Sequence, residues 1–136
     1  MKLLVDTSAL VALVMRDDRC HRPAAEFVRA NPGARFVLTD FVLSETVTII
    51  RLRAGAVRAV AVARDLLRSR RYQLLFVDAD LLEGALERMA RYADKRLSLV
   101  DCASFETMSR LGLKAAFTFD RDFRDCGYDM QPGAGL

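Results

Sequence analysis

Four short runs of almost uninterrupted apolar residues divide the 136-residue chain, and they restrict its possible folds more than any other feature. The runs cover residues 3–5, 36–38, 74–77 and 115–119, and a weaker fifth run covers residues 128–131. A strand with one face in water alternates between apolar and polar residues, whereas a strand covered on both faces of a parallel sheet is apolar throughout. We therefore predict a parallel sheet of four to five strands, covered on both faces.

The segments between these runs carry apolar residues at the spacing of an α-helix. Three such stripes are formed by Leu82, Ala85, Leu86 and Met89, by Val100, Ser104, Met108 and Leu111, and by Ala56, Val60, Ala63 and Leu67. Residues 8–15, 24–30 and 41–53 are predicted to form further helices, with Asp80 as an N-terminal cap and Gly112 as a helix end. Strands that alternate with helices indicate right-handed βαβ units, and hence a three-layer α/β/α sandwich.

The length suits one domain, which we place at residues 1–132, and residues 133–136 are expected to fray. Three cysteines without a close pair and a single histidine, His21, argue against a disulfide framework and against a zinc site of cysteine and histidine ligands. Neither a signal peptide nor a membrane-spanning segment is recognisable, so we expect a cytoplasmic protein. The net charge of +3 permits an anionic partner such as nucleic acid but does not require one.

Four acidic residues are expected at the edge of the sheet where ligands bind in open parallel sheets. Asp6 ends the first strand, and Asp120 follows the fourth. Asp101 begins a helix at the same edge, and Glu45 lies one turn into the helix after the second strand. Structural alternatives remain, because Asp6 and Asp101 could cap helices and Asp120 could be an ordinary turn residue. Glu45 lies on a strongly apolar helix, where a carboxylate needs a partner, and this favours a function.

Carboxylates that gather in one place repel one another unless some stay protonated or a cation joins them. Mg²⁺ and Mn²⁺ prefer oxygen ligands, and such an ion can activate water and stabilise charge on a phosphodiester. Because the chain has only one histidine, hydrolysis by carboxylates and a metal ion is the chemistry that its composition favours. The sequence therefore predicts a small metal-dependent nuclease.

Four sequence blocks, in this order, resemble motifs of the PIN domain family. They are residues 3–10 (LLVDTSAL), 44–46 (SET), 97–103 (LSLVDCA) and 117–123 (FTFDRDF). The similarity runs from about residue 2 to residue 132, and the compact length resembles the VapC-type toxins of toxin–antitoxin pairs. The resemblance implies a PIN-like fold and a ribonuclease that depends on Mg²⁺ or Mn²⁺.

The resemblance also assigns roles to individual residues. Those implied in metal binding and catalysis are Asp6, Glu45, Asp101 and Asp120. Asp122 is a weaker candidate for the position of the fourth acid, and Ser8 and Thr118 match hydroxyl positions that support the cluster. All acidic positions of the pattern are intact, which argues against the alternative of a non-catalytic PIN-fold module that binds RNA or protein.

The partners implied by the resemblance are an RNA substrate, a cognate antitoxin and a second copy of the chain. Arg51 and Arg53 are candidates for RNA binding, with a solvated helix face as the alternative. An apolar groove between the helices at residues 8–15, 24–30 and 41–67 is where we expect a partner peptide. Phe119 and the other aromatic residues fall mostly in core patterns, so we do not predict that they stack on bases.

A phosphatase of the haloacid dehalogenase type is a second enzyme class with acids at the strand ends of an α/β fold. That chemistry needs a second aspartate two residues after the nucleophile. Ser8 occupies that position here, which counts against this alternative.

Overall fold

The computed structural model describes residues 1–133, so of the expected frayed tail only residue 133 is described and the rest lies outside the described residues. Five strands form one sheet in the order β3-β2-β1-β4-β5, and every neighbouring pair is parallel. The strands are β1 (Lys2–Val5), β2 (Arg35–Thr39), β3 (Tyr72–Leu75), β4 (Ala115–Phe117) and β5 (Asp129–Gln131). The predicted parallel sheet is confirmed, including its short fifth strand.

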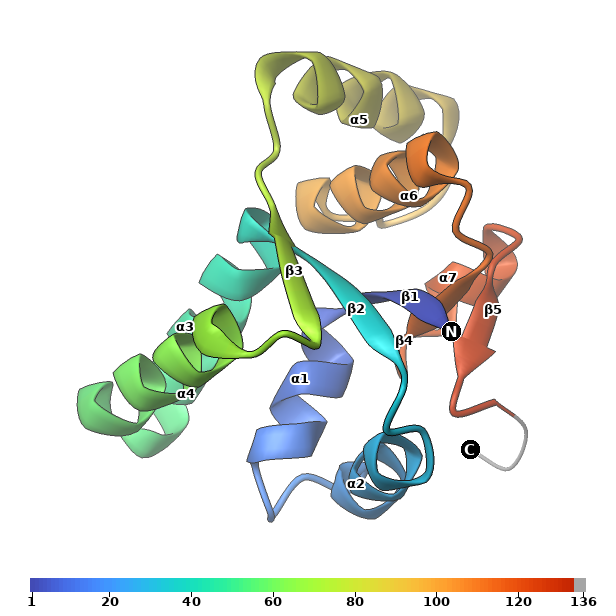
Figure 1. Ribbon diagram of the computed structural model, residues 1–136. Helices are drawn as coiled ribbons and strands as arrows, with labels where there is room; N and C mark the ends of the chain where they lie inside the picture. The colour runs from blue at the N-terminus through green and yellow to red at the C-terminus, as the bar shows by residue number, and fades with distance from the viewer. Residues whose placement is uncertain (134–136) are drawn as a thin grey trace.

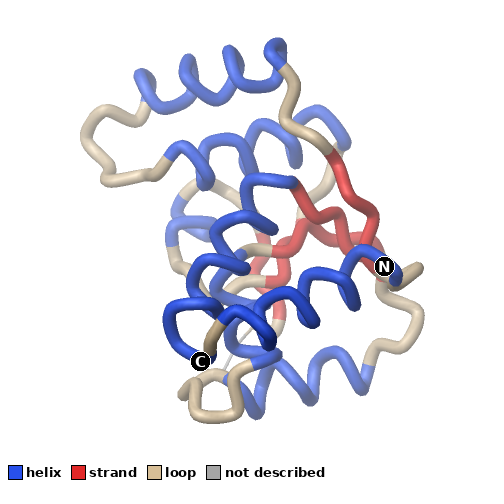
Figure 2. The backbone as a smooth tube through the Cα atoms, turned by 90° about the vertical axis from the view of Figure 1, so that its left-hand side faces the viewer, coloured by secondary structure: helices blue, strands red, loops and turns tan. Residues whose placement is uncertain are grey.

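Helices cover both faces of this sheet, as the two views of the backbone show (Figures 1 and 2). They are α1 (Thr7–Val14), α2 (His21–Ala30), α3 (Asp40–Ala54), α4 (Ala56–Arg68), α5 (Ala79–Arg91), α6 (Leu99–Leu111) and α7 (Asp122–Asp125). Side chains from α1 to α4 share one core cluster, and side chains from α5 to α7 share the other. This is the predicted three-layer α/β/α sandwich.

The central strand β1 explains why its sequence run is apolar throughout. Leu3 and Val5 point to one face, where they join the cluster around Phe36 and Phe117. Leu4 points to the other face and joins the cluster around Phe105. Leu3, Leu4 and Val5 have no solvent exposure (0%), as expected for a strand that separates two cores.

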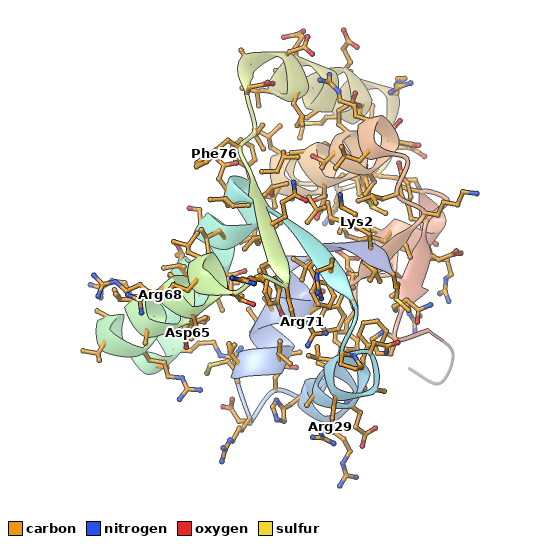
Figure 3. All side chains as sticks on the ribbon, in the orientation of Figure 1. Lys2, Arg29, Asp65, Arg68, Arg71 and Phe76 are labelled. Carbon is orange, nitrogen blue, oxygen red and sulfur yellow. The ribbon has the colours of Figure 1, made fainter. Side chains whose placement is uncertain are left out.

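The third apolar run departs from this pattern, because β3 lies at the edge of the sheet. It begins at Tyr72 and ends at Leu75, earlier than the predicted span of residues 74–77, and its residues are partly buried except for Gln73, which is exposed. Phe76, just past its end, is 69% exposed and points away from the body (Figure 3). An edge strand has only one neighbour to cover it, so an apolar run alone overestimates its burial.

Two helix predictions need correction. The cap of α5 is Asp78, whose carboxylate accepts a hydrogen bond from the Leu81 N–H at 2.8 Å, and not Asp80. Asp80 lies in the first turn and instead pairs with Arg110. The four-residue helix α7 was not predicted, because one turn is too short to show a periodic pattern. The fourth strand likewise ends at Phe117, two residues before the predicted end at residue 119.

The long helices α3 and α4 pack against each other and stand out from the rest of the molecule (Figure 1). Gly55 joins them with a φ of 90°, a left-handed conformation that suits glycine. Within residues 1–133, every helix is too short or too polar to cross a lipid bilayer.

Candidate active site

The carboxyl ends of β1 and β4 lie side by side and carry the first two acids of the predicted cluster. The two strands are parallel, with Val5 opposite Phe117, and the Asp6 N–H continues the pairing by donating to the Phe117 carbonyl at 3.0 Å. Asp6 and Thr118 therefore leave the sheet at the same point, and Asp120 follows two residues later. The helices α3 and α6 bring Glu45 and Asp101 from other parts of the chain.

Asp6 is almost completely buried, with 4% of its surface exposed. One of its oxygens accepts hydrogen bonds from the Ser8 hydroxyl at 2.7 Å and from the Thr118 hydroxyl at 3.0 Å. The same carboxylate caps α1 through the Ser8 N–H at 3.4 Å. Ser8 and Thr118 thus lie where the sequence placed them, against an acid, and the capping alternative for Asp6 holds at the same time.

Burial raises the pKa of Asp6 from 3.8 to about 6. The hydrogen bonds from Ser8 and Thr118 oppose this shift, and the charges of Asp101 and Asp120 add to it. Ionising Asp6 is costly because it is buried and lies near other carboxylates. A cation bound nearby would stabilise its charged form.

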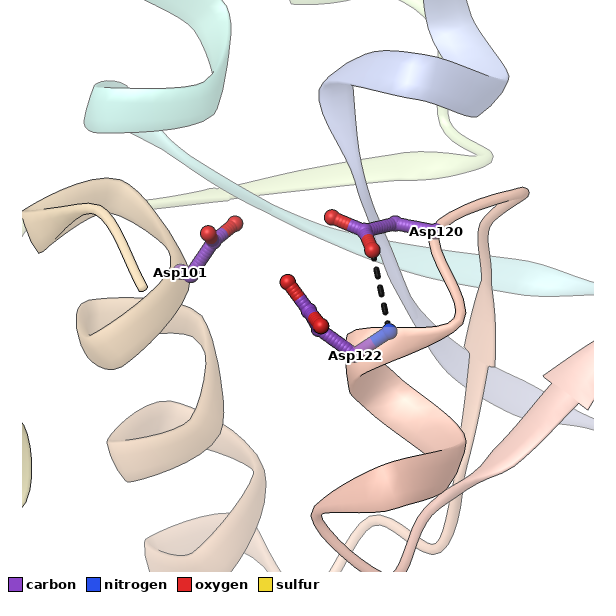
Figure 4. Close-up of side chains that lie close together, drawn as sticks. All are labelled: Asp101, Asp120 and Asp122. Carbon is purple, nitrogen blue, oxygen red and sulfur yellow. Dashed lines mark hydrogen bonds between the residues drawn. The ribbon is translucent and has the colours of Figure 1, made fainter. Parts of the chain in front are cut away.

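Three aspartates point toward one another at this edge (Figure 4). One carboxylate oxygen from each of Asp101, Asp120 and Asp122 lies within 4.8 Å of the other two. The Asp122 N–H donates to Asp120 at 2.9 Å and so ties the start of α7 to the loop before it. Asp6 and Glu45 are not members of this group of three, although Asp122, the weaker candidate from the sequence, is.

Asp101 has two structural tasks in addition to its place in this group. It is the third residue of α6, and its carboxylate accepts from the Ser98 N–H at 3.1 Å. The Ser98 hydroxyl in turn accepts from the Asp101 N–H at 3.0 Å, which completes the predicted capping box. Capping occupies one Asp101 oxygen, Oδ2, and is compatible with metal binding through the other.

The electrostatics of the cluster fit a divalent cation. Burial, and then the charges of Asp120 and Glu45, raise the pKa of Asp101, while hydrogen bonds from Ser98 oppose the shift. Burial, followed by the charges of Asp120 and Asp125, also raises the pKa of Asp122 against the opposing charge of Lys95. These carboxylates make one another harder to ionise. Mg²⁺ or Mn²⁺, which prefer oxygen ligands, would neutralise their negative charge.

Two adjoining cavities open beside the acids. The smaller, about 420 Å³, is lined by Thr7, Ser8, Val11, Asp18, Arg19, Cys20, Ile49, Arg53, Phe119 and Asp120. The larger, about 690 Å³, is lined by Arg19, Cys20, Phe119, Arg121, Arg124, Tyr128, Asp129, Met130, Gln131 and Gly133. They share Arg19, Cys20 and Phe119, so they form one continuous depression that starts at Asp120.

The two arginines predicted to bind substrate differ in position. Arg53 lines the smaller cavity together with Asp120, and it also lies 3.8 Å from Asp17 and 4.0 Å from Asp18. Arg51 is exposed on α3 and is not among the residues that line either cavity.

Sequence reasoning missed four residues of this depression: Arg19, Phe119, Arg121 and Arg124. Phe119 packs against the core, as its sequence pattern predicts, but it is only partly buried and also borders both cavities. A signal was present for Arg121, which stands directly between the two aspartates of the fourth block. Arg19 and Arg124 lie in a loop and in the unpredicted helix α7, where no periodic pattern marks a surface.

Comparisons with known proteins agree with this architecture. The family model of the PIN domain matches residues 3–127. The 23S rRNA-specific endonuclease VapC20 of Mycobacterium tuberculosis is 35% identical over 126 residues, which are 93% of this chain and 95% of the relative. The crystal structure of VapC20, described as a Sarcin-Ricin loop cleaving toxin, superposes with a TM-score of 0.85 at 34% identity and covers 93% of this chain and 95% of VapC20.

A more distant solved structure shares the fold alone. It is VapBC2 from Rickettsia felis bound to a DNA fragment from its promoter, with a TM-score of 0.71 at 10% identity. The superposition covers 96% of this chain and 98% of that one, so the whole sandwich is common to both.

Proposed function

This chain belongs to the PIN domain family, and from this premise we propose that it is a metal-dependent endoribonuclease and the toxin of a VapBC-type toxin–antitoxin pair. The observation that carries the proposal is the convergence of carboxylates from four separate segments on one edge of the sheet. The 35% identity to an rRNA endonuclease over nearly the whole chain supports RNA as the substrate class. Ribosomal RNA is accordingly the first substrate to test.

Asp101, Asp120 and Asp122 are the residues that would hold Mg²⁺ or Mn²⁺, since their oxygens already face one another. When bound, the ion supplies positive charge that stabilises the developing negative charge on a phosphodiester. Glu45 adds negative charge near Asp101, whose pKa it raises. Asp6 lies close enough to the group for the charges of Asp101 and Asp120 to raise its own pKa. Ser8 and Thr118 hold Asp6 in one orientation through their hydroxyl groups.

Cleavage of RNA by purified protein, with Mg²⁺ or Mn²⁺ and with EDTA, tests the proposal. We expect wild-type protein to cut RNA only with the ion, and Asp6→Asn or Asp101→Asn to lower the rate at least a hundredfold, because the charge that favours the ion is reduced. An asparagine oxygen can accept the same backbone hydrogen bonds, from the Ser8 N–H at position 6 and from the Ser98 N–H at position 101, so both variants should keep the fold. Asp65→Asn is the matched control, since Asp65 is exposed on α4 (Figure 3). Full activity in EDTA would contradict the metal dependence, and a folded wild-type protein that binds RNA without cutting it would favour the non-catalytic module.

A cognate antitoxin is the second partner in this proposal, and the helices α3 and α4 offer it an apolar surface. Leu52 is 81% exposed, Val57 88%, Val60 46% and Leu67 51%. Side chains this apolar and this exposed on neighbouring helices indicate a surface that another chain covers. A small cavity of about 300 Å³ lies between the end of α1 and the start of α4, but its lining of Met15, Arg16, Asp17, Ala54 and Arg58 is largely charged, so the exposed side chains of α3 and α4 are the apolar surface that we propose for the partner.

Co-expression with the neighbouring small reading frame tests the antitoxin surface. We expect the two chains to co-purify, and we expect the double variant Leu52→Asp/Val57→Asp to lose the partner while it keeps its own melting temperature. Leu86→Asp is the control, because Leu86 is 44% exposed on α5 and so lies on the other face of the sheet. Retention of the partner by the double variant would place the contact elsewhere.

A homodimer and a cytoplasmic location complete the proposal. Light scattering at several protein concentrations measures the oligomeric state of the protein without its partner. Cell fractionation gives its location, which for an enzyme that cuts ribosomal RNA should be the cytoplasm.

A further inference from the structure

We propose that the larger cavity binds the phosphate backbone of the RNA strand next to the cut, and that Arg19, Arg121 and Arg124 form this subsite. The inference rests on the proposed ribonuclease function. It adds the path of the RNA strand on the side of the acidic residues where the larger cavity lies. At about 690 Å³ the cavity lies within the range of roughly 300–1,000 Å³ that is usual for ligand-binding pockets.

The lining of the cavity is positively charged. Three arginines line it together with one acidic residue, Asp129. All three arginines are exposed, and within residues 1–133 none of them forms an ion pair. An arginine without a carboxylate partner keeps its planar set of donors available for a phosphate group, which it can bind through two parallel hydrogen bonds.

These arginines do not belong to one solvated helix face. Arg19 comes from the loop between α1 and α2, Arg121 from the loop after β4, and Arg124 from α7. The fold brings two separate segments together around one cavity, since Arg19 comes from one and Arg121 and Arg124, at the N-cap of α7 and within it, come from the other. Three like charges therefore line the same space. Such an arrangement is stabilised by an anion that fills the space.

The cavity also continues directly from the acidic edge. Arg19 and Phe119 line both cavities, and Asp120 lines the smaller one. A strand with the phosphodiester to be cut at Asp120 would therefore place its neighbouring phosphates near the arginines. Phe119, at the junction, offers a partly exposed ring on which a base can stack without sequence preference.

RNA fits this cavity better than an acidic peptide of the partner protein does. The apolar surface that a protein partner would bury lies on α3 and α4, whereas the arginine cavity is built from the α1–α2 loop, β5 and α7. Phosphates are also the anions that the adjoining acidic cluster has to meet if it cuts a phosphodiester.

Binding of a labelled single-stranded oligoribonucleotide by the Asp6→Asn protein with Mg²⁺ tests the inference without cleavage. We expect Arg121→Gln/Arg124→Gln to weaken binding roughly tenfold at 0.1 M salt and to reduce the slope of log K against log salt concentration by about 1.4, or about 0.7 for each lost phosphate contact. Arg121→Lys/Arg124→Lys keeps the charge and should keep most of the slope. Arg91→Gln, on the exposed side of α5, is the matched control and should change neither quantity.

The outcomes separate this inference from the proposed function. Unchanged affinity and slope in the glutamine double variant, while wild-type protein cuts RNA, would overturn the subsite alone. The predicted loss of binding in a protein whose wild type cuts no RNA would support the subsite and contradict the ribonuclease function. Unchanged RNA binding together with loss of the co-purified partner would assign the arginines to a protein contact and overturn the inference.

Discussion

At the scale of single residues, Asp6 combines two requirements that conflict in the absence of a cation. It is buried among the central strands, yet it must ionise beside Asp101 and Asp120 if it is to attract a metal ion. The hydroxyl groups of Ser8 and Thr118 reduce this conflict without removing it, because the pKa stays at about 6. In the metal-free protein, folding therefore makes Asp6 harder to ionise than it is in the unfolded chain.

This conflict predicts a pH dependence of stability. Between pH 3.8 and about 6 the folded protein binds more protons at Asp6 than the unfolded chain does, so the contribution of Asp6 to the free energy of unfolding falls as the pH rises through that window. Asp6→Asn removes the ionisation and should make the metal-free protein more stable than wild type at pH 7, by about 2–3 kcal/mol, with little difference near pH 4. Urea unfolding in EDTA at both pH values measures the difference. A variant that is less stable than wild type at pH 7 would show that capping of α1 is the main role of Asp6.

Which site residues the sequence could predict follows from their positions on the strands. Asp6 and Asp120 could be predicted at one edge because parallel strands present their carboxyl ends there, and this rule needs only the strand boundaries. The place of Asp122 beside Asp101 and Asp120 could not be predicted, because it depends on the turn of α7, a helix with no periodic signal. Arg19 and Arg124 gather through loops whose paths are set by tertiary packing and not by local pattern.

At the scale of helices and strands, α5 and α6 pack through a partly buried ionic contact as well as through apolar side chains. Glu106 on α6 accepts from Arg88 of α5 at 3.1 Å and from Arg110 at 3.1 Å. Gly84 of α5 lies so near that an added Cβ would be 2.7 Å from Glu106 Oε1, so glycine permits the close approach. Burial disfavours the charged form, but the hydrogen bonds and charges of Arg110 and Arg88 outweigh it and lower the pKa of Glu106.

Neutralising this contact should destabilise the helix pair. We expect Glu106→Gln to reduce the free energy of unfolding by about 1–3 kcal/mol at pH 7, because two charge-assisted hydrogen bonds are weakened in a mostly buried position. The loss should shrink as the pH falls below 4.5, since a group with a lowered pKa gives up its stabilisation when it is protonated in the fold. Glu87→Gln, exposed on α5, is the control and should stay within about 0.5 kcal/mol of wild type. Equal stability of the two variants would mean that apolar packing alone holds α5 to α6.

The elements themselves were largely predictable, and the exceptions have physical reasons. The helix α6 showed its stripe, its capping box at Ser98 and its end at Gly112, which adopts a φ of 67°. In α5 two aspartates competed for the cap, and only Asp78 has the extended backbone that a cap needs. The span of β3 was misjudged because the strand pairs with β2 from Tyr72 to Leu75, so the apolar run at residues 74–77 covers only its second half.

At the scale of the whole molecule, the acidic edge joins segments from both ends of the chain, so an ion bound there should stabilise the entire fold. We expect Mg²⁺ or Mn²⁺ to raise the melting temperature by several degrees, which corresponds to about 2.7 kcal/mol when the ion is at a hundred times its Kd. Asp120→Asn should abolish most of this rise, and a sodium chloride series of equal ionic strength separates specific binding from screening. An unchanged melting temperature at millimolar Mg²⁺ and Mn²⁺ would argue against the metal site.

The order of the strands also determines when the proposed enzyme can first become active during its synthesis. The central strand β1 is synthesised first, but one of its two neighbours, β4, follows more than a hundred residues later. The hydrogen bond from the Thr118 hydroxyl to Asp6 joins residues that are 112 positions apart. Because ribosomes deliver a chain from its N-terminus, Asp6 must wait for almost the whole polypeptide before Asp120 can join it. A growing chain therefore cannot bring Asp6 and Asp120 together, and only a nearly finished one can close the site.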